Sequence, residues 1–115
     1  MKAAIPCMDD SGLSSQVCGH FGHTPFFTLV DTDSETVTAV ANAGHQADRT
    51  PAHAVAEMGA QVVLCSGMGH RAVHLLAELG VQAFMGAQGT VGETVQAWQD
   101  GRLAPASDET ACQGH

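Results

Sequence analysis

Residues 61–69 read Gln-Val-Val-Leu-Cys-Ser-Gly-Met-Gly, and this stretch decides the fold. Its first five residues are mostly apolar and have the length of a strand, which predicts a strand covered on both faces. The glycine-containing turn leads into residues 70–79, where apolar side chains recur at helical spacing. A buried strand that is followed at once by an amphipathic helix is typical of an α/β protein with parallel strands.

The same pattern extends outward in both directions. Further strands are predicted over 3–5, 26–30, 36–40 and 81–85, and further helices over 51–58 and 90–100. The strands 26–30 and 36–40 flank a turn and should form an antiparallel hairpin. We therefore expect an α/β domain over residues 1–104, with three layers and a five-stranded mixed sheet flanked by helices. Residues 105–115 are predicted to be a flexible C-terminal tail.

Composition restricts the class of function. The 115 residues carry 4 Lys+Arg and 12 Asp+Glu, and the resulting net charge of −8 argues against nucleic acid or an acidic membrane surface as a partner. No apolar run approaches the roughly 20 residues of a membrane span, and no secretory signal is evident. The sequence predicts a cytoplasmic monomer.

Cysteine and histidine suggest metal chemistry. The four cysteines include no close pair, whereas seven histidines are many for a chain of this length. Thiolate and imidazole together suit copper, zinc or iron-sulfur species. The loop Cys18-Gly19-His20-Phe21-Gly22-His23 places three such groups within six residues, and its glycines allow a close approach of the backbone to a ligand. A glycine-rich turn with surface histidines is an equally good interpretation of the loop taken alone.

Ligands of open α/β sheets bind beyond the carboxyl ends of the strands. Cys7 and Cys65 each end a predicted strand, so the topology could bring them near the loop, although a buried cysteine usually acts as a small hydrophobic residue. The turn Ser66–His70 offers backbone N–H groups at a helix start, which favour an anion. A plain turn between a strand and a helix is the alternative for this segment.

The remaining histidines are weaker candidates. His70 and His74 are one helical turn apart, but the glutamate that a metalloprotease helix needs between them is absent. A solvated helix face is therefore favoured, with His70 nearest to the anion site. His53 lies in a first helical turn and could line the same opening. A thiol enzyme based on Cys18 and His20 would lack the third, orienting group.

Several motifs resemble one known family. They are the loop ending in His20-Phe21-Gly22-His23, the strand entry Pro25-Phe26, the segment 62–69 and the helix end Leu79-Gly80-Val81. Together, over about residues 1–104, they are similar to the dinitrogenase iron-molybdenum cofactor biosynthesis family. The resemblance implies a ribonuclease-H-like motif and a role in binding, carrying or protecting metal clusters without substrate turnover. It also implies that His20 binds the cofactor.

Within that family the short chain most resembles the orange-protein members, which implies a non-covalently held molybdenum-copper sulfide cluster, S2MoS2CuS2MoS2, and association with MinD/Mrp-type ATPases. A regulatory scaffold acting through such an ATPase, or a carrier of iron-molybdenum cofactor precursors, is the alternative. His20 and His23 are the predicted metal ligands. The full predicted cofactor-binding set is His20, His23, Cys18, Phe21, Gly22, Met8, Gly67, Met68, Gly69, His70 and His53.

Overall fold

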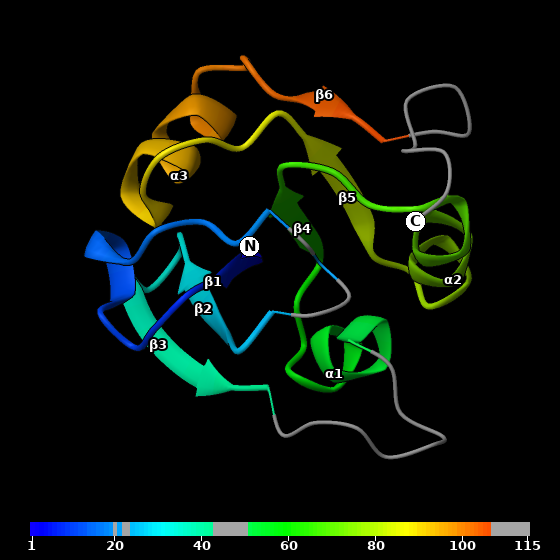
Figure 1. The fold of residues 1–115 in the computed structure, drawn as a ribbon, viewed down its shortest axis with the longest axis horizontal. Helices are drawn as coiled ribbons and strands as arrows, with labels where there is room; N and C mark the ends of the chain where they lie inside the picture. The colour runs from blue at the N-terminus through cyan, green and yellow to red at the C-terminus, as the bar shows by residue number, and fades with distance from the viewer. Residues whose placement is uncertain (20, 22–23, 43–50, 107–115) are drawn as a thin grey trace.

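The computed structural model describes residues 1–19, 21, 24–42 and 51–106. Its elements in chain order are β1 (Lys2–Cys7), the 3₁₀ turn η1 (Gly12–Ser14), β2 (Phe26–Asp31), β3 (Thr36–Ala41), α1 (Pro51–Glu57), β4 (Val62–Cys65), α2 (His70–Glu78), β5 (Gln82–Met85), α3 (Val91–Gln99) and β6 (Ala104–Pro105) (Figure 1). Every strand and helix predicted from the sequence is present, with ends shifted by at most two residues.

The strands form one mixed sheet in the order β3-β2-β1-β4-β5-β6. β1, β4 and β5 are parallel, whereas β1–β2, β2–β3 and β5–β6 are antiparallel. The predicted α/β class and the hairpin are therefore confirmed. No helix in the described part of the chain is both long and apolar enough to span a membrane.

The sheet has one strand more than predicted. After α3, the Arg102 N–H donates to the Ala97 carbonyl at 2.8 Å, and this turn directs the chain back along β5. There Ala104 pairs with Met85, so β6 extends to Pro105, one residue into the segment predicted as a tail. A two-residue strand has no period that a sequence pattern could show. Residues 107–115 lie outside the described residues.

β1 also continues further than predicted, through Pro6 to Cys7. A proline interrupts a strand because it lacks an N–H group for the neighbouring strand. The described pairing of β1 with β4 ends at Ala4, so no β4 residue needs that donor at Pro6. On its other side β1 stays paired with β2 along its whole length.

The helices cover both faces of the sheet, and alternate residues of each strand belong to different cores. α1 and α2 lie on one face and α3 on the other (Figure 1). In β4, Val63 packs in the α1/α2 core and Leu64 in the α3 core. This alternation follows from the two-residue period of a strand. The same period determines on which face of the sheet each side chain at a strand end lies, and therefore which of these side chains can contact one another.

α3 begins with a complete capping box. The Glu93 N–H donates to Thr90 Oγ1 at 3.2 Å, and the Thr90 N–H donates to Glu93 Oε1 at 3.2 Å. Gly89, immediately before the box, has φ +72°, and a Cβ at this position would lie 2.8 Å from Glu93 Oε1. The cap therefore needs a glycine at this point for space as well as for conformation.

We expect Gly89→Ala to lower the free energy of unfolding by about 2 kcal/mol, the sum of a left-handed backbone penalty of about 1 kcal/mol and loss of the hydrogen bond from the Thr90 N–H to the displaced Glu93 carboxylate, also worth about 1 kcal/mol. Gly101→Ala is the matched control, because Gly101 has φ +75° but no atom within 4 Å of the position that a Cβ would occupy. It should cost about 1 kcal/mol. Urea unfolding measures both variants, and equal losses would contradict the role assigned to the Glu93 contact.

Candidate functional site

The carboxyl ends of three parallel strands meet at one edge of the sheet. β1 ends at Cys7, β4 at Cys65 and β5 at Met85. Segments that follow such ends converge there, which makes this edge the usual ligand site of open α/β sheets. The candidate site consists of this edge and the segments that follow each strand.

The loop after β1 is fastened to the end of that strand at two points. The Cys18 N–H donates to the Pro6 carbonyl at 2.9 Å. The Thr24 hydroxyl lies 3.0 Å from the Cys7 carbonyl and donates to it. Segment 19–23, which carries both predicted metal ligands, therefore lies between two residues that are bonded to successive carbonyl groups of β1.

The same loop is bonded on its other side to the segment before α3. The Val17 N–H donates to the Gly89 carbonyl at 2.9 Å, and the Val91 N–H donates to the Ser15 carbonyl at 2.9 Å. The loop thus bridges the ends of β1 and the start of α3. Its backbone is held by β1, by the start of α3 and by its own side chains Asp9, Ser15 and Thr24.

Three of the predicted ligands, His20, Gly22 and His23, lie outside the described residues. Phe21, which lies among them in the sequence, is described and is 4% exposed. Its ring meets that of Phe27 edge-on, with the ring centres 6.0 Å apart. Phe21 therefore anchors the loop in the core.

The two methionines predicted as apolar walls differ in position. Met68 is 3% exposed and packs in the same core cluster as Phe21, beneath α1 and α2. Met8 is 52% exposed and contributes to neither core. Phe21 and Met68 therefore bring the loop after β1 and the turn before α2 to the same side of the sheet.

The expectation that Cys7 and Cys65 converge is wrong. Both thiols are fully buried, but Cys7 packs in the α3 core and Cys65 in the α1/α2 core, on opposite faces of the sheet. Cys7 Sγ lies 3.2 Å from Thr28 Oγ1 and donates to the Asp9 carbonyl at 3.4 Å. The alternative interpretation, small buried hydrophobic residues, describes both cysteines. Cys18 is 6% exposed, at the start of the candidate loop.

The start of α2 is open to an anion, whereas the start of α3 is not. The N-cap of α2 is Gly69, which has no side chain to accept a hydrogen bond from the first turn. α3 is closed by Thr90 and Glu93, and the Ala87 N–H in the segment before it is bonded to the Cys65 carbonyl. Of the two glycine-rich helix starts, only that of α2 has no side-chain cap of its own.

The surroundings of the α2 start combine apolar and polar groups. Gly69 is buried, Gly67 is half-buried, and His70 and Arg71 are exposed on the first turn. His53 is half-buried on α1, which packs against α2. Within the described ranges, no three His, Cys, Asp or Glu side chains are grouped to hold a metal ion. The described residues at the α2 start thus combine a helix N-terminus that has no side-chain cap with the exposed side chains of His70 and Arg71.

The α3 side of the edge carries negative charge. The Ser11 N–H donates to Asp9 Oδ1 at 3.0 Å and holds the pKa of that carboxyl below its ordinary value. Asp9 therefore stays ionised at neutral pH, and Asp10 beside it is also exposed. An anionic ligand is repelled by these carboxylates and is better accommodated towards α2.

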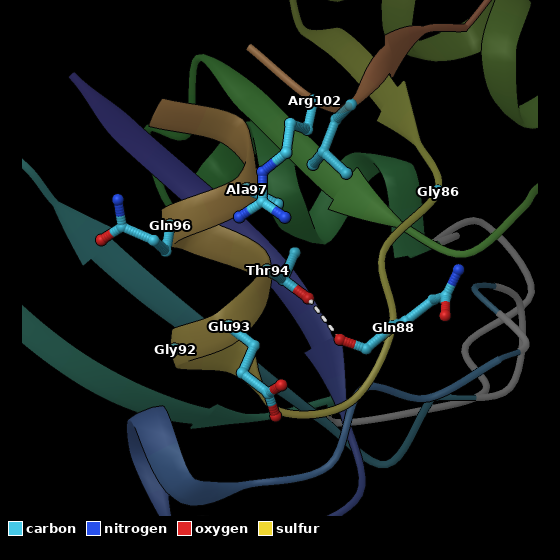
Figure 2. A pocket seen from close by; sticks show the side chains of 9 residues that line it. Gly86, Gln88, Gly92, Glu93, Thr94, Gln96, Ala97 and Arg102 are labelled. Carbon is cyan, nitrogen blue, oxygen red and sulfur yellow. Dashed lines mark hydrogen bonds between the residues drawn. The ribbon is translucent and has the colours of Figure 1, made fainter. Parts of the chain in front are cut away.

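A cavity lies elsewhere, between α3 and the segments on either side of it. It measures about 620 Å³, and Thr94 donates a hydrogen bond to the Gln88 carbonyl at 3.3 Å along its wall (Figure 2). Of the described segments expected to surround a ligand, only the turn 86–89 reaches it, and no described residue of the predicted cofactor-binding set does; its lining residues are Gly86, Gln88, Gly92, Glu93, Thr94, Gln96, Ala97, Arg102 and Leu103. The cavity is thus separate from the loop motif.

Comparison of the sequence with models of protein families shows to which family the chain belongs. The model of the family described as dinitrogenase iron-molybdenum cofactor matches residues 1–101. The chain belongs to this family. The sequence resemblance to the iron-molybdenum cofactor proteins is therefore confirmed, whereas the individual site residues remain predictions.

Solved structures of similar fold support this assignment. The protein PH0822 is 31% identical, with a TM-score of 0.79, over 94% of this chain and 98% of that chain. The apo form of the orange protein from Desulfovibrio gigas is 28% identical, with a TM-score of 0.82, over 92% of each chain. A Thermotoga protein, TM1290, is 29% identical, with a TM-score of 0.79, over 90% of this chain and 91% of its own. No curated protein matches the sequence.

Sequence reasoning did not single out Thr24 or Asn42, although both hold the candidate site together. The Asn42 side-chain amide donates to the Thr24 carbonyl at 2.8 Å. Neither residue belongs to a recognisable ligand motif. The only sequence signal is that a polar residue stands next to the end of a predicted strand on each side of the hairpin.

We expect Cys7 and Cys65 to resist alkylation by iodoacetamide in the native apo protein. Both side chains are fully buried, so the reaction must wait for an opening of the fold, and labelling should be slower than in denaturant by at least about 100-fold. Mass spectrometry of the cysteine peptides measures each rate. Native labelling of Cys65 at the denatured rate would contradict its burial.

Proposed function

We propose that this protein binds an anionic metal-sulfur cluster non-covalently and carries or stores it. The cluster is its cargo, and no substrate is turned over. Membership of the iron-molybdenum cofactor family supports the general class of cargo. The alternative of a thiol enzyme based on Cys18 and His20 is less favoured, because Cys18 is only 6% exposed and no third, orienting group is evident in the sequence.

One observation carries the proposal. Phe21 of the family loop and Met68 of the turn before α2 pack in the same core, so the loop and an uncapped helix start share one edge of the sheet. A helix start attracts negative charge through its N–H groups and its dipole. Local attraction of this kind is necessary because the net charge of −8 repels an anionic cluster.

The roles of the residues follow from this arrangement. We assign metal coordination to His20 and His23, and contact with the cluster sulfides to the backbone around Gly67, Gly69 and His70. Imidazole and sulfide are both suitable ligands for a thiophilic metal such as copper. Cys18 and His53 stand second to these residues, because a buried thiol and a half-buried imidazole offer less accessible ligand atoms.

For the identity of the cargo we propose the molybdenum-copper sulfide cluster S2MoS2CuS2MoS2. This choice over an iron-molybdenum cofactor precursor rests on the sequence resemblance to the orange-protein members, and the fold is similar to that of the apo orange protein from Desulfovibrio gigas. Association with MinD/Mrp-type ATPases remains a prediction of the sequence resemblance, as do the monomeric state and the cytoplasmic location.

We expect protein purified from its source to be coloured and to contain molybdenum and copper. The double variant His20→Ala with His23→Ala should retain cluster at least about tenfold less well, because both imidazole ligands are lost. Elemental analysis and the visible absorption spectrum measure retention. His74→Ala is the control, since His74 is exposed one turn further along α2. Unchanged metal content and spectrum in the double variant would overturn the assignment of these ligands.

A further inference from the structure

A chain of hydrogen bonds joins the end of the candidate loop to the ends of three strands. The Thr24 hydroxyl lies 3.0 Å from the Cys7 carbonyl of β1 and 2.8 Å from the Phe26 carbonyl of β2. The Asn42 side-chain amide, directly after β3, donates to the Thr24 carbonyl at 2.8 Å. The Asn42 N–H donates to the Pro25 carbonyl at 2.9 Å. We call this group the Thr24–Asn42 latch.

The polar groups of the latch are protected from water. Thr24 is 2% exposed and Asn42 is half-buried. A buried hydrogen bond is not easily replaced by one to solvent, so losing the hydroxyl removes the link between Thr24 and the paired ends of β1 and β2. Thr24 belongs to neither apolar core. Valine has nearly the same shape, so the hydroxyl rather than the volume of Thr24 provides the restraint.

The position of the latch connects it to cargo binding. Thr24 is the residue immediately after segment 19–23, and Asn42 fixes the backbone of Thr24 to the end of β3. At the other end of the segment, Cys18 is bonded to Pro6. Both ends of the segment are thus restrained, and a chain segment with restrained ends has fewer conformations to lose on binding a ligand than one with free ends.

We infer that Thr24 and Asn42 are positioning residues for the cargo, which they do not touch. They pre-organise the loop Cys18–His23, and replacing either residue should make the protein release the cluster faster. This inference rests on the proposed function, because it concerns the retention of the same cargo.

The test uses full-length protein loaded with tetrathiomolybdate and Cu(I). Thr24→Val removes the hydroxyl and Asn42→Ala removes the side-chain amide, and each should release the metals at least about tenfold faster than the unaltered protein. Thr24→Ser keeps the hydroxyl and should stay within about twofold of it. Metal content after gel filtration gives the rates. Visible circular dichroism should also change in the first two variants and not in Thr24→Ser, because the loop no longer holds the cluster in one geometry.

Val95→Ala is the control for general destabilisation, since Val95 packs in the α3 core on the opposite face of the sheet from Phe21. Release from Val95→Ala as fast as from Thr24→Val would overturn the latch, because retention would then follow stability alone. Retention by both Thr24→Val and Asn42→Ala equal to that of the unaltered protein would overturn only the latch. Failure of the unaltered protein to take up the metals would overturn the proposed function together with the latch. If Thr24→Val does not fold, Asn42→Ala alone decides.

Discussion

The candidate site depends on the two last carbonyl groups of β1. β1 lies between β2 and β4, and its residues from Ala3 to Cys7 are buried. Water cannot reach carbonyls at such a position easily, so they need partners within the protein. The Cys18 N–H of the loop is the partner of the Pro6 carbonyl, and the Thr24 hydroxyl adds a hydrogen bond at the Cys7 carbonyl, where β1 is paired with Phe26 of β2. The need to satisfy the strand thereby determines where the family motif is attached.

The two-residue period of the strands is the second constraint, because it separates the thiols. Cys7 and Cys65 end neighbouring parallel strands but belong to opposite cores. A metal held jointly by these two residues would require one of them to leave its core. The arrangement instead favours a cargo that brings its own sulfur and that the protein holds with imidazole and backbone N–H groups.

The N-termini of α2 and α3 differ in their caps, and this difference makes the two sides of the candidate site unequal. In α3 the side chains of Thr90 and Glu93 form hydrogen bonds with backbone N–H groups at the helix start. In α2 the N-cap Gly69 has no side chain that could accept a hydrogen bond from the first turn. Asp9 and Asp10 place negative charge in the loop between β1 and η1, and Arg71 places positive charge on the first turn of α2. In a chain of net charge −8, this local asymmetry gives an anion one favourable approach.

The sequence by itself determined the order of the elements, the α/β class and the family, since hydrophobic periods and the His-Phe-Gly and Gly-Met-Gly motifs are local patterns. It also marked the α2 start as an anion site from its glycines. Only the tertiary structure decided that Cys7 and Cys65 lie apart, that Phe21 anchors the loop, that β6 extends the sheet and that Thr24 and Asn42 join the loop to three strands. These features depend on which face of the sheet a side chain occupies and on hydrogen bonds between residues far apart in the sequence, such as Asn42 and Thr24, which are 18 positions apart. Such relations arise from the pairing of strands, which no local pattern along the chain records.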